Sequence, residues 1–238
     1  MDFTPEPDTD LFERLRFGGQ PVANPASVVV DGNARFTILT SRLLRLEWSS
    51  TGAFEDRGSY AFPTRYAPAP PFEVESRDNV LVIDTGALTL RHVRGNGRFT
   101  AGNLSITFSV GDRSVTWTPG MPNPENLRGT RRTLDVCEGD AALDQGLLSR
   151  AGWSLFDDSQ AVLFNPEDGW VMPPRTHEVQ DWYFFAYGHD YKGALAEYAQ
   201  FGGPVPLIPR YVLGAWWSRY WAYSDQDLRE LVGGFEQH

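Results

Sequence analysis

Short strand-like runs separated by turn-forming residues dominate the first half of this sequence. The pattern is clearest where Leu44, Leu46 and Trp48 alternate with Arg45 and Glu47, because a period of two places the apolar side chains on one face of a strand. Runs of about five residues recur about every ten residues, a spacing typical of a β-sandwich. The predicted strands are Ser27–Val30, Arg35–Thr40, Leu44–Trp48, Phe72–Glu75, Val80–Asp84, Ala87–Arg91, Leu104–Val110 and Ser114–Thr118.

Turn residues mark the joints between these runs. Asp31-Gly32-Asn33 separates the first two, and Asp78-Asn79, Thr85-Gly86 and Gly111-Asp112 punctuate later ones. Residues 119–180 are irregular, and such long loops are usually functional or packed against something. Asp181–Tyr187, with four aromatic residues, predicts a further buried strand. We therefore expect a mainly β fold with a sandwich over residues 26–188, preceded by a loose lead-in over 1–25 that holds a short helix at Asp10–Arg16.

The hydrophobic period changes after Gly188. Asp190 can cap a helix from Tyr191 to about Phe201, which Gly202-Gly203-Pro204 would end. A proline-rich connector completes residues 189–209. Val212–Trp217 is an apolar run suited to a buried strand, and Ser224-Asp225 can cap a second, amphipathic helix. Residues 210–238 thus predict the beginning of an α/β unit.

Composition excludes several classes of partner. The chain has 238 residues and a formal net charge of −10, which disfavours nucleic-acid phosphates and anionic membranes but leaves neutral ligands open. No apolar run approaches the roughly 20 residues of a membrane helix. The acidic, proline-broken start does not resemble a secretory signal. Cys137 is the one cysteine and forms no internal disulfide, so we expect a cytoplasmic protein.

Chemistry-bearing motifs are sparse. The adjacent Asp157 and Asp158 suggest acid–base work or, more often, a turn or cap, and neighbouring strand residues point to opposite faces, so at most one of them would line a given pocket. His177 and His189 lack the spacing of a metal site. We see no serine-nucleophile motif and no phosphate loop. The sequence therefore predicts no cofactor and no metal.

Aromatic residues crowd the C-terminal region. Trp216, Trp217, Tyr220, Trp221 and Tyr223 fall within a short stretch. Aromatic rings stack on the apolar faces of sugars, and a neutral sugar would suit an acidic protein. Core packing is the alternative for each ring. Residues and spacing alone leave both interpretations open.

At these positions the chain resembles the N-terminal part of glycoside hydrolase family 31, the α-glucosidase and α-xylosidase group. The resemblance runs from about Ser27 to the end. It rests on motifs in fixed order: Gly129-Thr130-Arg131-Arg132-Thr133-Leu134-Asp135, Gly146-Leu147-Leu148-Ser149-Arg150, Gly152-Trp153, Asp157-Asp158-Ser159 and Gly214-Ala215-Trp216-Trp217-Ser218-Arg219-Tyr220-Trp221. It implies a galactose mutarotase-like sandwich followed by a (β/α)8 barrel that hydrolyses α-linked glycosides with retention.

The resemblance also implies where the catalytic groups lie. The family's nucleophile and acid/base aspartates come from later barrel strands, whereas about 30 residues follow Pro206 here and a barrel needs about 200 or more. No position receives a catalytic role, and we expect the chain alone to be inactive. The resemblance makes Asp158, Arg219, Tyr220, Trp221 and Tyr223 candidate substrate-binding residues for an α-linked oligosaccharide or glycoside.

Two alternatives stay open. The chain could be a stand-alone carbohydrate-binding sandwich, or an interaction module that pairs with a separate barrel chain. An isolated first barrel strand would leave its backbone edges unpaired, so self-association through the exposed C-terminal strand is also expected.

Overall fold

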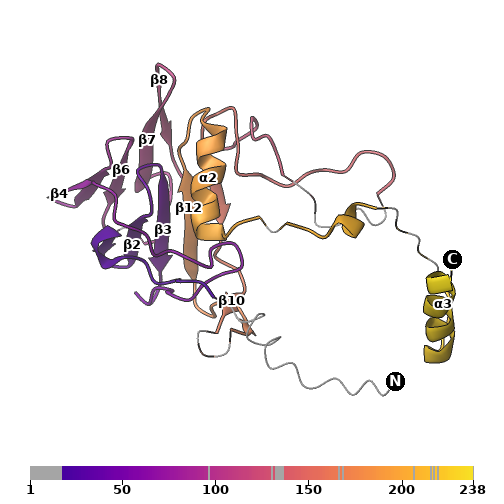
Figure 1. Cartoon of the computed structure of the whole chain (residues 1–238). Helices are drawn as coiled ribbons and strands as arrows, with labels where there is room; N and C mark the ends of the chain where they lie inside the picture. Colours follow the sequence, from indigo (N-terminus) through magenta and orange to yellow (C-terminus); the bar gives the residue numbers. More distant parts are fainter. Residues whose placement is uncertain are drawn as a thin grey trace. The chain divides into compact units, whose positions relative to one another are not determined.

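The computed structural model describes residues 18–95, 97–129, 131, 137–165, 167, 169–205, 207–214, 216, 218 and 220–237 (Figure 1). The chain divides into two units, one ending at Pro204 and one beginning at Val205. Each unit is described by itself below. The predicted helix at Asp10–Arg16 lies outside the described residues.

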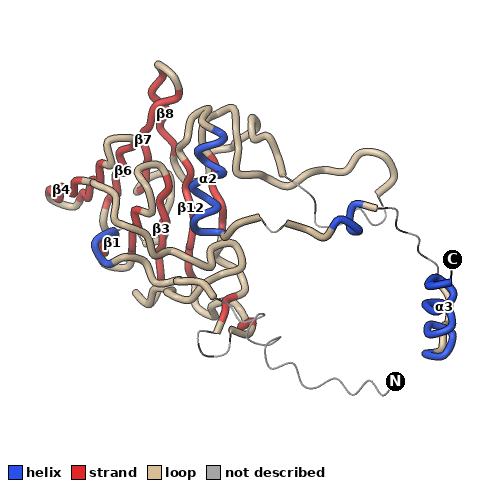
Figure 2. The backbone as a smooth tube through the Cα atoms, in the orientation of Figure 1, coloured by secondary structure: helices blue, strands red, loops and turns tan. Residues whose placement is uncertain are grey.

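Two five-stranded antiparallel sheets form the first unit (Figure 2). Sheet I has the order β1-β2-β3-β12-β9 and sheet II the order β4-β5-β6-β7-β8, while β10 and β11 pair separately. The strands of sheet I are β1 Val28–Asp31, β2 Ala34–Ile38, β3 Leu43–Ser49, β12 Val179–Phe185 and β9 Ser154–Asp157. Those of sheet II are β4 Glu73–Arg77, β5 Val80–Asp84, β6 Leu88–Val93, β7 Leu104–Val110 and β8 Arg113–Trp117, and the separate pair is β10 Leu163–Phe164 and β11 Val171–Met172.

This arrangement confirms the prediction of a mainly β sandwich. The predicted strands at 80–84 and 104–110 agree with β5 and β7 at both ends. Other predicted strands shift by one or two residues, and the short 3-10 helix Pro25–Ser27 precedes β1. The strands β9, β10 and β11 were not predicted from the sequence. β9 is a four-residue strand at a sheet edge, and its assignment depends on pairing with β12, from Ser154 opposite Phe185 to Asp157 opposite Trp182.

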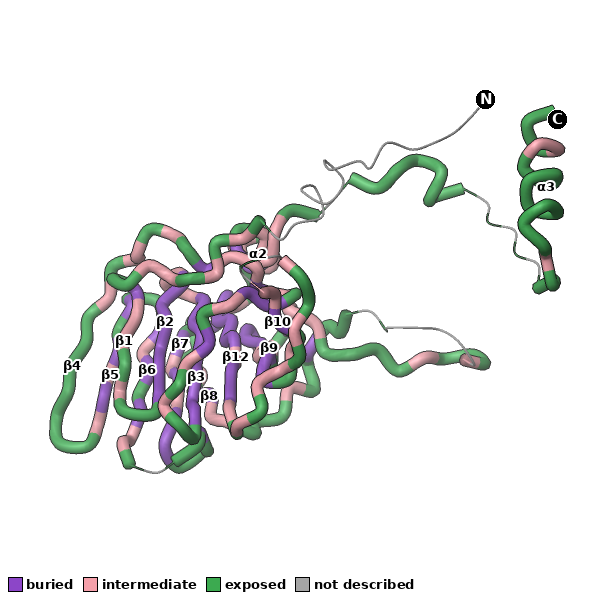
Figure 3. The backbone as a smooth tube through the Cα atoms, turned by 90° about the horizontal axis from the view of Figure 1, so that it is seen from below, coloured by how far each residue is buried: buried purple, intermediate pink, exposed green. Residues whose placement is uncertain are grey.

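The main core lies between the two sheets. Alternate side chains of β2 and β3, including Phe36 and Leu46, contact those of sheet II, such as Ile83 and Leu90, all of them fully buried. Phe184 of β12 packs against Trp117 of β8, with ring centroids 4.7 Å apart. The period of two therefore places apolar residues inside, as predicted. Figure 3 shows the buried central strands and the exposed edge strand β4.

The outer face of sheet I is also covered. Helix α2, Tyr191–Gly202, packs on it through Ala194 and Phe201, which share a second core cluster with Phe185 (Figure 1). Asp190 caps α2 by accepting a hydrogen bond from the Gly193 amide at 3.0 Å, which confirms the predicted cap. The rest of this face carries charged side chains.

The second unit contains the short 3-10 helix Arg210–Leu213, called η2, and helix α3, Asp225–Gln237. Ser224 caps α3, because its hydroxyl accepts from the Asp227 amide at 3.2 Å and the Asp227 carboxylate accepts from the Ser224 amide at 2.9 Å. The second predicted helix is confirmed. Its apolar face, Leu228, Leu231, Val232 and Phe235, is not buried within the structure.

The strand predicted at Val212–Trp217 is wrong for the residues that the structure describes. Val212 and Leu213 belong to η2, and residues 215 and 217 lie outside the described set. A strand needs a neighbouring strand that pairs with its backbone N–H and C=O groups. The described part of this unit contains no strand that could do so. The start of a barrel at 210–238 and the domain limits drawn from the sequence stay predictions.

Candidate functional site

The two adjacent aspartates at the end of β9 take opposite environments. Asp157 is exposed, and its carboxylate accepts hydrogen bonds from the Ser159 amide at 3.0 Å and the Ser159 hydroxyl at 2.5 Å. It is therefore the turn residue of the pair. Asp158 points inward and is 1% exposed.

Asp158 is a buried carboxyl group whose oxygens form no hydrogen bond of normal geometry, although the Ser59 hydroxyl lies close enough to favour the charged form of the carboxyl. Burial and the nearby charge of Asp181 raise its pKa to about 6, although the Ser59 hydroxyl and the guanidinium groups of Arg65 and Arg45 partly oppose the shift. The Nη2 atom of Arg65 is likewise buried and unpaired. An unmatched acceptor and an unmatched donor thus lie in one region, which is uncommon in protein interiors.

A charged cluster surrounds Asp158 on the outer face of sheet I. We define this cluster as Arg35, Arg45, Glu47, Glu55, Arg65, Asp158, Arg175 and Asp181. Arg45 binds Asp181 through two hydrogen bonds of 2.8 and 2.7 Å, and Arg175 forms a further ion pair with the same carboxylate. These cations hold the pKa of Asp181 low, at about 2, despite its burial.

Glu47 continues the cluster along sheet I. Its carboxylate accepts from Arg35 at 2.6 and 2.9 Å and lies 3.1 Å from Arg45 Nη2. These residues come from the same face of β2 and β3, as their alternation with apolar neighbours requires. Burying several charges is tolerated because each carboxylate other than Asp158 has a cationic partner.

Tyr183 of β12 joins the charged cluster to the apolar region under α2. Its hydroxyl accepts a hydrogen bond from Arg65 Nε at 2.6 Å, and its ring stacks on Phe62 with centroids 3.4 Å apart. Burial raises the pKa of Tyr183 well above its usual value, so the phenol stays neutral. Arg65 is thereby fixed close to Asp158.

This arrangement does not match two-carboxyl catalysis. A retaining glycosidase needs a nucleophile and an acid/base carboxyl facing one bond. Asp181 is committed to two guanidinium groups, and Asp158 is the one carboxyl of the cluster without an ion-pair partner. In the described residues no group of His, Cys, Asp and Glu could hold a metal ion.

The predicted aromatic residues belong to the second unit. The side chains of Tyr220 and Trp221 are exposed and that of Tyr223 is half-buried, while Arg219 lies outside the described residues. Asp158 belongs to the first unit. The substrate-binding role of these five residues stays a prediction.

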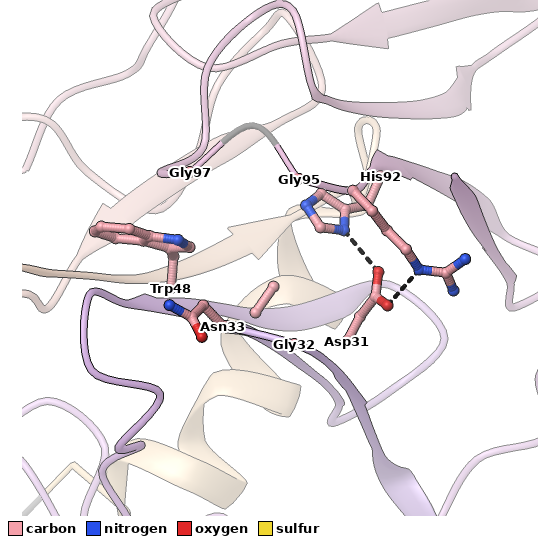
Figure 4. A pocket seen from close by; sticks show the side chains of 9 residues that line it. Asp31, Gly32, Asn33, Trp48, His92, Gly95 and Gly97 are labelled. Atoms are coloured by element: carbon pink, nitrogen blue, oxygen red, sulfur yellow. Dashed lines mark hydrogen bonds and ion pairs between the residues drawn. The ribbon is translucent and has the colours of Figure 1, made fainter. Parts of the chain in front are cut away.

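A pocket that the sequence analysis did not predict lies at one end of the sandwich (Figure 4). Its volume is about 340 Å³. The lining residues are Asp31, Gly32, Asn33, Ala34, Trp48, His92, Arg94, Gly95 and Gly97. The one signal in the sequence was the Asp31-Gly32-Asn33 turn, because His92 and Arg94 are distant in the chain and show no motif.

No protein-family model and no curated protein matches this sequence. Solved structures do match. A mutant of the GH31 dextranase FjDex31A from Flavobacterium johnsoniae, complexed with isomaltotriose, has 15% identity and a TM-score of 0.48, over 88% of this chain and 31% of the dextranase. The same dextranase complexed with glucose gives 14% identity and a TM-score of 0.47, over 88% and 31% of the two chains.

A third match is the uncharacterized protein lmo2446 from Listeria monocytogenes EGD-e, in complex with glucose, magnesium and calcium. It has 16% identity and a TM-score of 0.44, over 89% of this chain and 25% of the other. The chain thus spans less than a third of the length of the dextranases it matches. These dextranases carry the family designation that the sequence motifs resemble, and at such low identity the likeness concerns the fold alone.

Proposed function

We propose that this chain supplies the N-terminal sandwich of a retaining α-glycosidase of the α-glucosidase and α-xylosidase type. The observation that carries the proposal is the ordered run of motif residues between Gly129 and Ser159. In this proposal the nucleophile and the acid/base group belong to a barrel of which these residues provide at most the start, so the chain by itself has no hydrolytic activity.

The local structure explains why glycines are needed in this run. A Cβ atom at Gly146 would lie 2.5 Å from the Arg128 carbonyl oxygen, because residues 126–129 and 144–149 run side by side. The Asn126 amide side chain bonds to the Gly146 carbonyl and amide, both at 2.8 Å, and the Leu127 amide bonds to the Leu148 carbonyl at 2.8 Å. The motif residue Gly146 therefore lies where two segments approach too closely for a side chain.

The environment of Asp158 supports a role in sugar recognition. Its two unpaired oxygens can accept from sugar hydroxyls, and the unpaired Arg65 Nη2 can donate to one. Asp158 is 1% exposed, so in this proposal the residues that cover it must rearrange before it can contact a substrate. We propose that Asp158 shapes the sugar site together with the aromatic residues at 220–223.

Hydrolysis of an aryl α-glucoside by the purified 238-residue chain tests this proposal. We expect no release of the aryl group, with an α-glucosidase that has a complete barrel as the positive control. Turnover that persists in the Asp157→Asn, Asp158→Asn and Asp181→Asn triple variant would leave the proposal without a mechanism. A gene in which the downstream sequence encodes no barrel would contradict it independently.

The second unit favours an alternative role as an interaction module. Leu228, Leu231, Val232 and Phe235 form an apolar face on α3 that the described residues of the second unit do not bury. Such a face normally packs against a protein surface. A separate barrel chain or a second copy of this chain would provide one, and co-purification separates these two cases.

A further inference from the structure

The pocket at the end of the sandwich is built by both sheets. Asp31 ends β1 and Trp48 belongs to β3 of sheet I, whereas His92 belongs to β6 of sheet II and Arg94 follows it. The Asp31 carboxylate accepts from His92 Nδ1 at 3.0 Å and from Arg94 Nε at 2.5 Å (Figure 4). This three-residue bridge ties the two sheets together across the pocket wall.

The charged groups of the pocket are already paired. Asp31 and Arg94 neutralise each other, and the remaining Arg94 nitrogens donate to the Ser76 hydroxyl at 2.9 Å and the Asp78 carbonyl at 3.2 Å. Burial lowers the pKa of His92, against the opposing effect of Asp31, so the imidazole is neutral at pH 7. A charged ligand would find no free counter-charge here.

Two polar ring atoms of the pocket have no partner. Among the described residues none forms a hydrogen bond with His92 Nε2 or with the Trp48 indole N–H, and neither atom belongs to the fully buried unpaired set. Neither atom is therefore fully buried, although His92 and Trp48 as whole residues are only 4% and 9% exposed. In Figure 4 the second ring nitrogen of His92 points to the side on which Trp48 lies. Because His92 donates Nδ1–H to Asp31, its Nε2 is an acceptor, while the indole is a donor.

The exposed Asn33 adds an amide to the same wall, beside Trp48 (Figure 4). Its nitrogen makes only a long hydrogen bond of 3.5 Å to the Ser50 carbonyl. The pocket thus offers an acceptor, a donor and an amide that can do both, around a volume in the range of small-molecule sites. Hydroxyl groups, which donate and accept at once, match this set.

We propose that this pocket binds a neutral polyhydroxylated molecule, a monosaccharide ring or the end of an oligosaccharide. One hydroxyl donates to His92 Nε2, and a neighbouring hydroxyl oxygen accepts from the Trp48 indole N–H. The structural bridge explains the Asp31–His92–Arg94 contacts but leaves these two ring atoms without partners. The inference does not depend on the glycosidase proposal, because it needs no barrel and no catalysis.

Titration of the ¹⁵N-labelled 238-residue chain with glucose and maltose tests the proposal. The Trp48 indole cross-peak is assigned from its loss in Trp48→Phe, and Trp170→Phe, at an exposed tryptophan outside the pocket, is the matched control. We expect saturable movement of the Trp48 cross-peak with either sugar. Inorganic phosphate should move it little, since no free cation lines the pocket.

Affinity measured by calorimetry completes the test. Trp48→Phe should weaken sugar binding by about three- to tenfold, the value of one neutral hydrogen bond, and Trp170→Phe should not change it. Asn33→Ala, at an exposed side chain, gives a second variant that keeps the fold, as circular dichroism would verify. An unmoved Trp48 cross-peak at saturating sugar, or equal loss of affinity in Trp48→Phe and Trp170→Phe, would overturn the proposal while leaving the glycosidase proposal intact.

Discussion

Arg45 and Asp181 form a two-point ion pair, with hydrogen bonds of 2.8 and 2.7 Å, although 136 residues separate them in the chain. Their side chains are 1% and 2% exposed. The pair joins β3 to β12 at the centre of sheet I, where Arg45 also contacts Glu47. The charge distribution of the outer face therefore depends on a contact between the beginning and the end of the sandwich.

Removing Asp181 should strongly destabilise the sandwich. Asp181→Ala leaves the Arg45 and Arg175 guanidinium groups buried with a missing partner, which costs about 3–5 kcal/mol of unfolding free energy. Glu178→Ala is the matched control, because Glu178 pairs with Arg98 at the exposed surface and should cost less than about 1 kcal/mol. Urea denaturation measures both. Equal losses of unfolding free energy in Asp181→Ala and Glu178→Ala would contradict the conclusion that Asp181 neutralises buried guanidinium groups.

Replacing Asp158 should stabilise the fold at high pH, whereas replacing Asp181 should destabilise it. Its pKa of about 6 in the fold exceeds the unfolded value of about 3.9, so the folded protein holds a proton that the unfolded chain releases. Unfolding free energy from this group therefore falls as pH rises from about 4 to 6, by up to about 3 kcal/mol. Asp158→Asn removes that loss and should be more stable than the wild type at pH 8.

Denaturation at pH 5 and pH 8 checks this difference. Asp181→Asn serves as the comparison, because the pKa of Asp181 is lowered to about 2 and its contribution is complete above about pH 4 and lost as pH falls through 2. Asp181→Asn should thus be less stable than the wild type at pH 8. An Asp158→Asn variant that is also destabilised at pH 8 would show that its carboxylate has partners.

Sugar binding at the end pocket should weaken in acid. His92 must be neutral to accept a hydroxyl proton at Nε2, and its pKa in the fold lies below the usual 6.5. The charged groups that face the ring are Asp31 and Arg94, and its other neighbours are the rings of Phe36 and Phe99. Affinity should be constant from pH 7 to 8 and decline in acid as the imidazole gains a proton. Calorimetric titration from pH 8 down to the lowest pH at which the chain stays folded tests it, and affinity that stays unchanged while NMR shows the His92 ring gaining its proton would remove His92 from the contact.

Gly152 should not tolerate a side chain. Its φ is +82°, and an added Cβ would lie 2.4 Å from Val110 Cγ2 and 3.1 Å from Gly188 Cα. Gly152→Ala combines backbone strain with overpacking and should cost about 2–4 kcal/mol. Gly86→Ala is the control, because Gly86 has a φ of +77° and open space around it. Its loss of stability, about 1 kcal/mol, measures the cost of backbone strain without a clash. Thermal unfolding of both variants measures the difference, and equal effects would exclude the steric clash.

The apolar face of α3 should drive association. We expect the apparent mass of the chain in light scattering to increase with concentration. Replacing Leu231 and Phe235 by Glu should restore the mass of a monomer, since both are exposed apolar residues of that face. Arg229→Gln, at an exposed polar position of the same helix, should not change association. A wild-type chain that stays monomeric at all concentrations would contradict this prediction.

Local signals in the sequence determined much of this fold. The period of two in β3, the Asp190 and Ser224 caps and the turn at Gly32, where φ is +63°, each involve residues close in the chain. Local dihedral preferences and nearby hydrogen bonds suffice for such features. For Asp157 and Asp158 the sequence left an acid–base role and a turn or cap both open, and indicated only that at most one of them would line a given pocket.

Only the tertiary structure decided the features that depend on distant partners. β9 is a strand because β12 pairs with it. The described residues of the apolar run predicted as a strand, residues 212–214 and Trp216, do not form one, because the described residues of that unit provide no strand to pair with. Asp158 has a raised pKa and Asp181 a lowered one because guanidinium groups from other segments reach the second carboxylate and leave the first unpaired. The end pocket needs Asp31, Trp48 and His92 from three strands of two sheets, a juxtaposition that no spacing along one strand can specify.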